Sequence, residues 1–196
     1  VRTGMLISLG VYAALSAVVL IFAEPMLTLM ATDASIIEAS ASYIRIESIA
    51  NIFGILTQFA LVALVTVNKS KYLYALTGAR LVLCLLSDTF LVSTLPISAN
   101  LGVNGIGYSN ILVNALLLAV SLILLSREGI NVFAKSKLDF GWVKSFAKIG
   151  GISGMESLVR NVAYMVMIAR MVNMVGEQGT YWVANNFIWG WLLLPV

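Results

Sequence analysis

Six long apolar segments follow one another along the chain, and this succession constrains the fold more than any other feature. A helix that crosses the hydrocarbon core of a bilayer needs about 20 mostly apolar residues. The segments that approach or exceed this length are Gly4–Ala23, Ser48–Val67, Tyr72–Leu95, Gly105–Ser126, Lys148–Val175 and Tyr181–Val196. The sequence therefore predicts an all-α, polytopic membrane protein with six transmembrane helices.

The composition agrees with a membrane protein and argues against an enzyme. The chain is 60% hydrophobic and 11% charged, whereas soluble domains carry about 25% charged residues. It contains no histidine and a single cysteine, Cys84. A disulfide framework, a Cys/His zinc site and a histidine-based catalytic dyad are therefore excluded. We expect no enzymatic activity and no bound cofactor, apart from a coupling Na⁺ or H⁺.

The basic residues between the segments gather in two loops. The loop 68–71 holds Lys69 and Lys71, and the loop 127–148 holds five Lys and Arg residues, whereas the loops 24–42, 96–104 and 176–180 hold none. The positive-inside rule makes the two basic loops cytoplasmic. This arrangement accounts for the net charge of +3 without a nucleic-acid partner, and it predicts a multi-pass protein of the cell membrane.

Charges inside the apolar segments mark candidate functional residues, because a charge at the bilayer centre costs at least about 2.5–3.5 kcal/mol. Glu156 and Arg160 lie one helical turn apart in the fifth segment, followed by Asn161. Residues four apart meet on one helix face, so Glu156 could bind a cation that Arg160 replaces in the empty site. The alternative is a buried ion pair that only fixes helix packing.

Two further segments carry polar side chains. In the third segment, Arg80 is expected to reach the cytoplasmic headgroups, and Asp88 either pairs with a charge elsewhere, caps the neighbouring loop or serves transport. In the sixth segment, Asn185 and Trp189 share one helix face. They could line a cavity and stack an organic cation, or they could simply pack against other helices.

Three stretches together resemble the multidrug and toxic-compound extrusion (MATE) family. They are Glu24-Pro-Met-Leu-Thr-Leu-Met-Ala-Thr-Asp33, Leu101-Gly-Val-Asn-Gly105 and Ile149-Gly-Gly-Ile-Ser153-Gly154-Met-Glu156. Ile152 stands where the family often has proline, and Arg160 is not typical of its drug exporters. These departures suggest a divergent subgroup.

The resemblance implies a two-lobe fold of twelve helices, in which the six segments would be helices three to eight. Residues 1–127 would supply the last four helices of the N-terminal lobe. Residues 128–147 would form the cytoplasmic inter-lobe loop, and residues 148–196 the first two helices of the C-terminal lobe. We therefore expect an internal piece of a longer protein, whose partners are the remaining helices of the same chain, the lipid bilayer and a small organic substrate.

The resemblance also implies a function: secondary active efflux of amphipathic or cationic organic solutes by alternating access, driven by Na⁺ or H⁺ antiport. One alternative is a flippase for lipid-linked saccharides or peptidoglycan precursors, which favours a more cationic cavity. A second alternative is a structural membrane subunit. The candidate ion-coupling or substrate-binding residues are Glu156, Arg160, Asn161, Asn185, Trp189 and Asp88.

Overall fold

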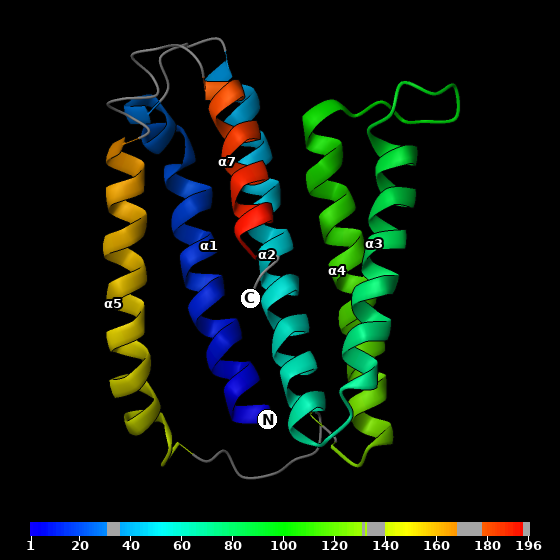
Figure 1. Ribbon diagram of the computed structural model, residues 1–196, viewed down its shortest axis with the longest axis vertical. Coiled ribbons are helices and arrows are strands. Elements are labelled where there is room, and N and C mark those ends of the chain that lie inside the picture. The colour runs from blue at the N-terminus through cyan, green and yellow to red at the C-terminus, as the bar shows by residue number, and fades with distance from the viewer. Residues whose placement is uncertain (31–35, 131, 133–139, 168–177, 194–196) are drawn as a thin grey trace. The chain divides into compact units, whose positions relative to one another are not determined.

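The computed structural model describes residues 1–30, 36–130, 132, 140–167 and 178–193 (Figure 1). The chain divides into two compact units, of which unit 1 comprises residues 1–27 and 35–139 and unit 2 comprises residues 28–34 and 140–196. The division at residue 139 falls inside the loop predicted between the lobes. Each unit is described by itself.

Unit 1 is built from four helices that run lengthwise beside one another (Figure 1). They are α1 (Arg2–Met30, its last residues beyond unit 1), α2 (Ile37–Thr66), α3 (Lys71–Leu91) and α4 (Gly102–Arg127). All four are long and apolar enough to cross a membrane. No strand occurs among the described residues. The predicted all-α, polytopic membrane fold is confirmed.

The core of unit 1 lies between α2 and α4, which make the most extensive helix–helix contact among the described residues. A buried apolar cluster fills the half of this contact near the α2–α3 loop, and α3 packs on it through Leu76. The members of the cluster are Ala60, Leu61, Ala63, Leu64, Leu76, Val113, Leu117 and Leu125. Leu64 and Leu125 are completely buried.

The helices α2 and α4 end in the same way. After α2, Asn68 adopts a positive φ of 62°, and after α4, Gly129 adopts a φ of 82°. In both cases the next backbone N–H reaches back five residues, from Lys69 to the Leu64 carbonyl at 3.0 Å and from Ile130 to the Leu125 carbonyl at 2.9 Å. This is the Schellman motif, which satisfies the last helical carbonyls. It fixes where both helices stop.

Several helix ends differ from the sequence prediction. The helix α1 continues seven residues past Ala23 because Glu24 pairs with Arg45 of α2 instead of facing lipid. The helix α3 ends at Leu91 rather than Leu95, since the loop before α4 folds back onto it. There the Leu101 N–H donates to the Leu91 carbonyl at 2.9 Å.

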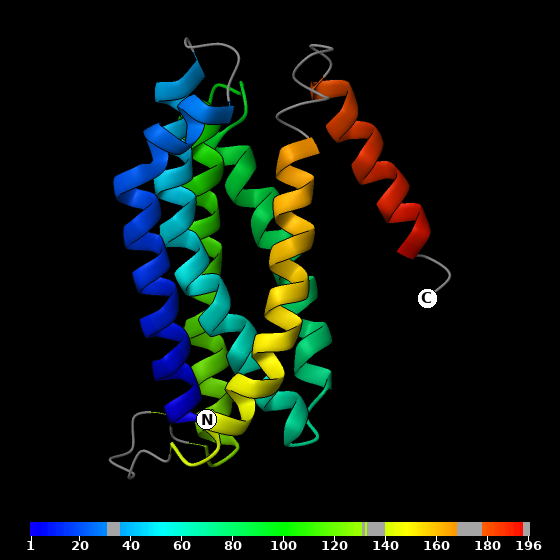
Figure 2. The ribbon, with the colours of Figure 1, turned by 90° about the vertical axis from the view of Figure 1, so that its left-hand side faces the viewer.

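Unit 2 contains two described helices, α5 (Val143–Met167) and α7 (Gln178–Leu193), both continuous (Figure 2). The helix α5 begins five residues before the predicted Lys148, with Trp142 and Phe146 in an edge-to-face contact at 5.6 Å. Within the described ranges neither helix is as suited to a span as the other four. The reasons are that Glu156 and Arg160 interrupt α5 and that α7 is 16 residues long.

Candidate functional site

Polar side chains join α2 to α4 at three levels. Asn104 Nδ2 donates to Ser42 Oγ at 3.2 Å, and Asn110 Nδ2 donates to Glu47 Oε2 at 2.9 Å. Deeper along both helices, Thr57 Oγ1 donates to the Asn114 backbone carbonyl at 3.2 Å. Residue numbers rise together on the two sides of these contacts, so the helices are parallel.

Small residues let the backbones of α2, α3 and α4 approach closely enough for these contacts. A Cβ added to Gly107 would lie 2.7 Å from Ile46 Cγ2, and one added to Gly105 would lie 2.9 Å from the Leu91 carbonyl oxygen. Gly105 ends the Leu101–Gly105 stretch that carries part of the family resemblance, and Gly107 follows two residues later. The motif is therefore explained by packing at the start of α4.

A polar cavity of about 270 Å³ opens beside this interface, within unit 1. We call it the polar cavity. All four helices contribute to its lining, which contains one carboxylate, one guanidinium, four carboxamides and one phenol. The lining residues are Tyr12, Glu47, Asn51, Gly54, Ile55, Gln58, Arg80, Asn110 and Asn114.

Helical spacing explains why these side chains converge. On α2, Glu47, Asn51 and Gln58 are separated by four and seven residues, which places them on one face. On α4, Asn110 and Asn114 are one turn apart and project toward that face. Asn114 Nδ2 lies 3.4 Å from the Ala50 carbonyl oxygen, and the side chain is 6% exposed.

The two charges of the polar cavity lie well inside their helices. At 1.5 Å per residue, Glu47 is about 15 Å from the start of α2, and Arg80 is about 14 Å from the start of α3. Arg80 is therefore near the middle of a 21-residue helix. It lines the polar cavity, whereas the sequence prediction placed it at the headgroups.

Glu47 and Arg80 share the polar cavity without forming an ion pair in the described part of the chain. Asn110 Nδ2 donates a hydrogen bond to the Glu47 carboxylate at Oε2. The formal charges balance, because the lining has one acidic and one basic side chain. Such a site can exchange one charged partner for another without a large net charge inside the bilayer.

Ionic contacts outside the polar cavity fix the two ends of unit 1. At one end, Arg45 Nη2 lies 2.9 Å from Glu24 Oε1, and Arg45 Nε donates to the Leu20 carbonyl at 3.2 Å. At the other end, Lys69 Nζ lies 2.9 Å from Glu128 Oε2, and the Tyr72 hydroxyl lies 3.3 Å from Glu128 Oε1. The hydrogen bond raises the pKa of Lys69 and lowers that of Glu128.

The predicted site residues of the fifth segment lie on α5, in unit 2, and their side chains are exposed. Within the described residues no ion pair joins Glu156 to Arg160. Instead, Arg160 Nη2 lies 3.5 Å from Ser157 Oγ, and Asn161 Nδ2 donates to the Ser157 carbonyl at 2.8 Å. The structure therefore does not form the expected pair, and the role of these residues stays a prediction.

Of the remaining predicted residues, Asp88 does not line the polar cavity, and Asn185 and Trp189 belong to unit 2. Asp88 is half-buried in the last turn of α3, where its backbone carbonyl, rather than its carboxylate, accepts the N–H groups of Val92 and Ser93. Asn185 is half-buried on α7. Trp189 belongs to the same helix, but its side chain lies outside the described residues.

The sequence prediction missed most of the polar cavity. Arg80 was predicted to reach the headgroups, and Glu47 and the carboxamides were not among the predicted site residues. Two signals were present: the spacing of Glu47, Asn51 and Gln58 on one helix face, and the Asn110–Asn114 pair one turn apart. What the sequence could not show is that α2 and α4, separated by α3, lie directly against each other.

A family model provides the decisive comparison, because the MatE model matches residues 1–90. This stretch covers α1, α2 and nearly all of α3, so it contains Glu47 and Arg80. The resemblance predicted from the motifs is confirmed for this part of the chain. The match suggests a transporter of the MATE superfamily, and it does not test the prediction that the chain has no enzymatic activity.

Neither the search of curated proteins nor the search of solved structures gave a match.

Proposed function

We propose that this chain belongs to a secondary active transporter that exports an amphipathic or cationic organic solute in exchange for inward-moving Na⁺ or H⁺. The observation that carries the proposal is the polar cavity, which Glu47 and Arg80 both line among four helices that are long and apolar enough to cross a membrane. Intramembrane ionisable residues that face a cavity are typical of ion and substrate pathways.

Glu47 is the coupling carboxylate in this proposal. Asn110 holds Oε2 from one side, so Oε1 is the atom that accepts a proton or binds Na⁺. Carboxylate and carboxamide oxygens suit a hard cation such as Na⁺, and Asn51 and Gln58 supply carboxamides on the same helix face. When the cation neutralises Glu47, the positive charge of Arg80 is no longer balanced in the cavity, which favours a different arrangement of α3.

The orientation follows from the charged ends of unit 1. The end where α1 begins and α4 ends carries Arg2, Lys69, Lys71 and Arg127 against Glu128 in the described residues, and the opposite end carries Glu24 and Glu38 against Arg45. The positive-inside rule supports placing the basic end, with the loops 68–71 and 127–148, on the cytoplasmic side of the plasma membrane.

Glu156, Arg160 and Asn161 on α5 are proposed as a second ion- or substrate-binding group, together with Asn185 and Trp189 on α7. Their support is the position of two charges near the middle of α5. Asp88 remains a weaker candidate at the end of α3.

The test compares matched carboxylates in the full-length protein, reconstituted into proteoliposomes with an imposed Na⁺ or H⁺ gradient. Glu47→Gln keeps the side-chain shape but removes the charge, and we expect gradient-driven flux of an organic cation to fall by at least roughly tenfold. Glu24→Gln, at the end of α1 outside the polar cavity, should transport normally. Undiminished flux in Glu47→Gln would overturn the assignment, and Glu156→Gln in the same assay tests the α5 group.

A second function, flipping of a lipid-linked saccharide, is favoured by one specific observation. The polar cavity combines Arg80 with four carboxamides and a phenol. Guanidinium groups recognise phosphate, and carboxamides both donate to and accept from sugar hydroxyls. In the same proteoliposomes, Arg80→Gln separates the two functions. It should abolish transbilayer movement of a fluorescent glycosyl-phospholipid if the protein is a flippase, and should spare binding of an organic cation if it is an exporter.

A further inference from the structure

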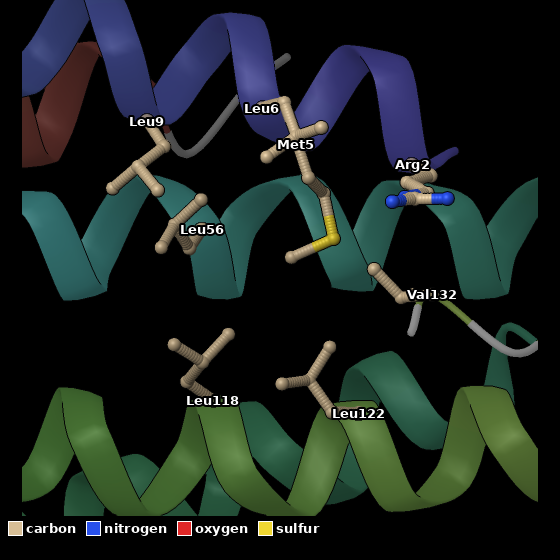
Figure 3. A pocket seen from close by; sticks show the side chains of 8 residues that line it. All are labelled: Arg2, Met5, Leu6, Leu9, Leu56, Leu118, Leu122 and Val132. Atoms are coloured by element: carbon tan, nitrogen blue, oxygen red, sulfur yellow. The ribbon is translucent and has the colours of Figure 1, made fainter. Parts of the chain in front are cut away.

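An apolar cleft, separate from the polar cavity, lies between α1, α2 and α4 at the basic end of unit 1. Its volume is about 390 Å³, within the roughly 300–1,000 Å³ range of small-molecule sites. It is lined by Arg2, Met5, Leu6, Leu9, Leu56, Leu118, Leu122 and Val132. Figure 3 shows the aliphatic side chains turned toward the space between the three helices, with Arg2 and Val132 at one end.

The lining separates into an apolar part and a charged end. Seven of the eight side chains are hydrophobic, and Arg2 is the single charged one. Arg2 occupies the first turn of α1, and Val132 follows the end of α4. The cleft therefore runs from the basic end of unit 1 into the apolar part of helices that are long enough to cross a membrane.

We propose that this cleft binds the acyl chain of an anionic phospholipid, whose phosphate lies at Arg2. The apolar walls match an acyl chain and offer nothing to a polar solute. The end of unit 1 that carries Arg2 also carries Lys69, Lys71 and Arg127 against a single acidic residue, Glu128, in the described residues. Basic residues at the membrane surface attract anionic lipids by about 1 kcal/mol each, so a zwitterionic lipid is the poorer ligand.

This site differs from the transport site in chemistry and in position. It shares no lining residue with the polar cavity. A bound lipid would contact α1, α2 and α4 together, and so would hold α1 against the α2–α4 pair. Its occupancy can be measured without transport, so failure of the transport proposal leaves it standing.

The experiment is native mass spectrometry of the full-length protein, incubated with equal amounts of phosphatidylglycerol and phosphatidylcholine. The wild type should retain phosphatidylglycerol roughly fivefold over phosphatidylcholine. Arg2→Gln should remove the preference while lipid is still bound. Leu122→Trp, which fills the cleft, should lose both lipids. Leu116→Trp is the matched control, because Leu116 is exposed on the same helix and does not line the cleft.

Leu118→Phe provides a second, milder filling variant if Leu122→Trp does not fold. Glycerol 1-phosphate, which has the charge but no acyl chain, should not compete for the site. Equal retention of the two lipids by the wild type would overturn the proposal. Wild-type retention of phosphatidylglycerol in a folded Leu122→Trp or Leu118→Phe protein would also overturn it, and would assign the preference to the basic surface alone.

Discussion

The polar residues of the α2–α4 pair in unit 1 and those of the helix α5 in unit 2 make different kinds of contact. Glu47, Asn104 and Asn114 make hydrogen bonds from one helix to the other. On α5, the contacts of Arg160 and Asn161 go to Ser157 of the same helix. Among the described residues, Glu47 of α2 therefore has a polar partner on a neighbouring helix, whereas the side-chain contacts of Arg160 and Asn161 stay within α5.

The glycines follow the same division. At Gly105 and Gly107 of α4 an added Cβ would meet neighbouring atoms at 3.0 Å or closer. At Gly151 and Gly154 of α5 it would meet nothing within 4 Å. The same residue type is therefore a packing requirement in one region and is unconstrained by described neighbours in the other. A pattern of small residues in the sequence therefore does not by itself indicate whether a glycine is required for close helix packing.

The largest effect is expected from replacing one glycine in each region by leucine. Gly107→Leu drives a side chain into Ile46, and we expect it to destabilise the protein by about 1–3 kcal/mol, as overpacking does. Gly154→Leu should be neutral or slightly stabilising, because leucine has the better helix propensity. Thermal unfolding of the full-length protein in detergent measures both. A loss at Gly154 as large as that at Gly107 would break the comparison, by showing that α5 is closely packed in the complete protein.

A smaller effect is expected from two double-mutant cycles. Glu47→Gln with Asn110→Leu should show a coupling energy of about 1–2 kcal/mol, because the hydrogen bond to the carboxylate crosses between helices. Glu156→Gln with Arg160→Met should show coupling near zero, since the structure forms no ion pair there. The sequence hypothesis of a Glu156–Arg160 pair makes the opposite prediction. Clear coupling in the second cycle would restore that hypothesis.

The sequence was sufficient for the membrane fold because hydrophobic length is a local property. Each span of unit 1 is visible as an uninterrupted or nearly uninterrupted apolar run, and the four helices follow these runs. Helix ends were less predictable where a distant residue decides them. The end of α1 depends on Arg45, which lies on the next helix.

The polar cavity could not be derived in the same way because it depends on which helices are neighbours. Glu47 and Asn110 are 63 residues apart in the chain, and nothing in either segment alone says that they touch. The prediction therefore favoured Glu156 and Arg160, whose proximity in sequence made a pair easy to infer. In the structure, Arg160 approaches Ser157 of the same helix rather than Glu156.

The smallest effect is expected at the water-exposed edge of unit 1, where Lys69 meets Glu128. The lowered pKa of Glu128 means that its contribution to stability is present above its ordinary value near 4.5 and is lost as the pH falls through the lowered pKa. The raised pKa of Lys69 means that its contribution is present below 10.5 and is lost as the pH rises through the raised pKa. The pair should thus stay intact between about pH 5 and pH 10.

Lys69→Met should therefore lower the unfolding temperature slightly, and by the same amount at pH 5.5, 7 and 9, because partly exposed ion pairs contribute little. Glu128→Gln should give a similar, pH-independent change, since it removes the other half of the same contact. Thermal unfolding of the three proteins at each pH makes the measurement. A difference from the wild type that grows or disappears across this range would mean that another titrating group faces the pair. In that case the pH dependence of the unfolding temperature would arise at the basic end of unit 1 and not at the contact between α2 and α4.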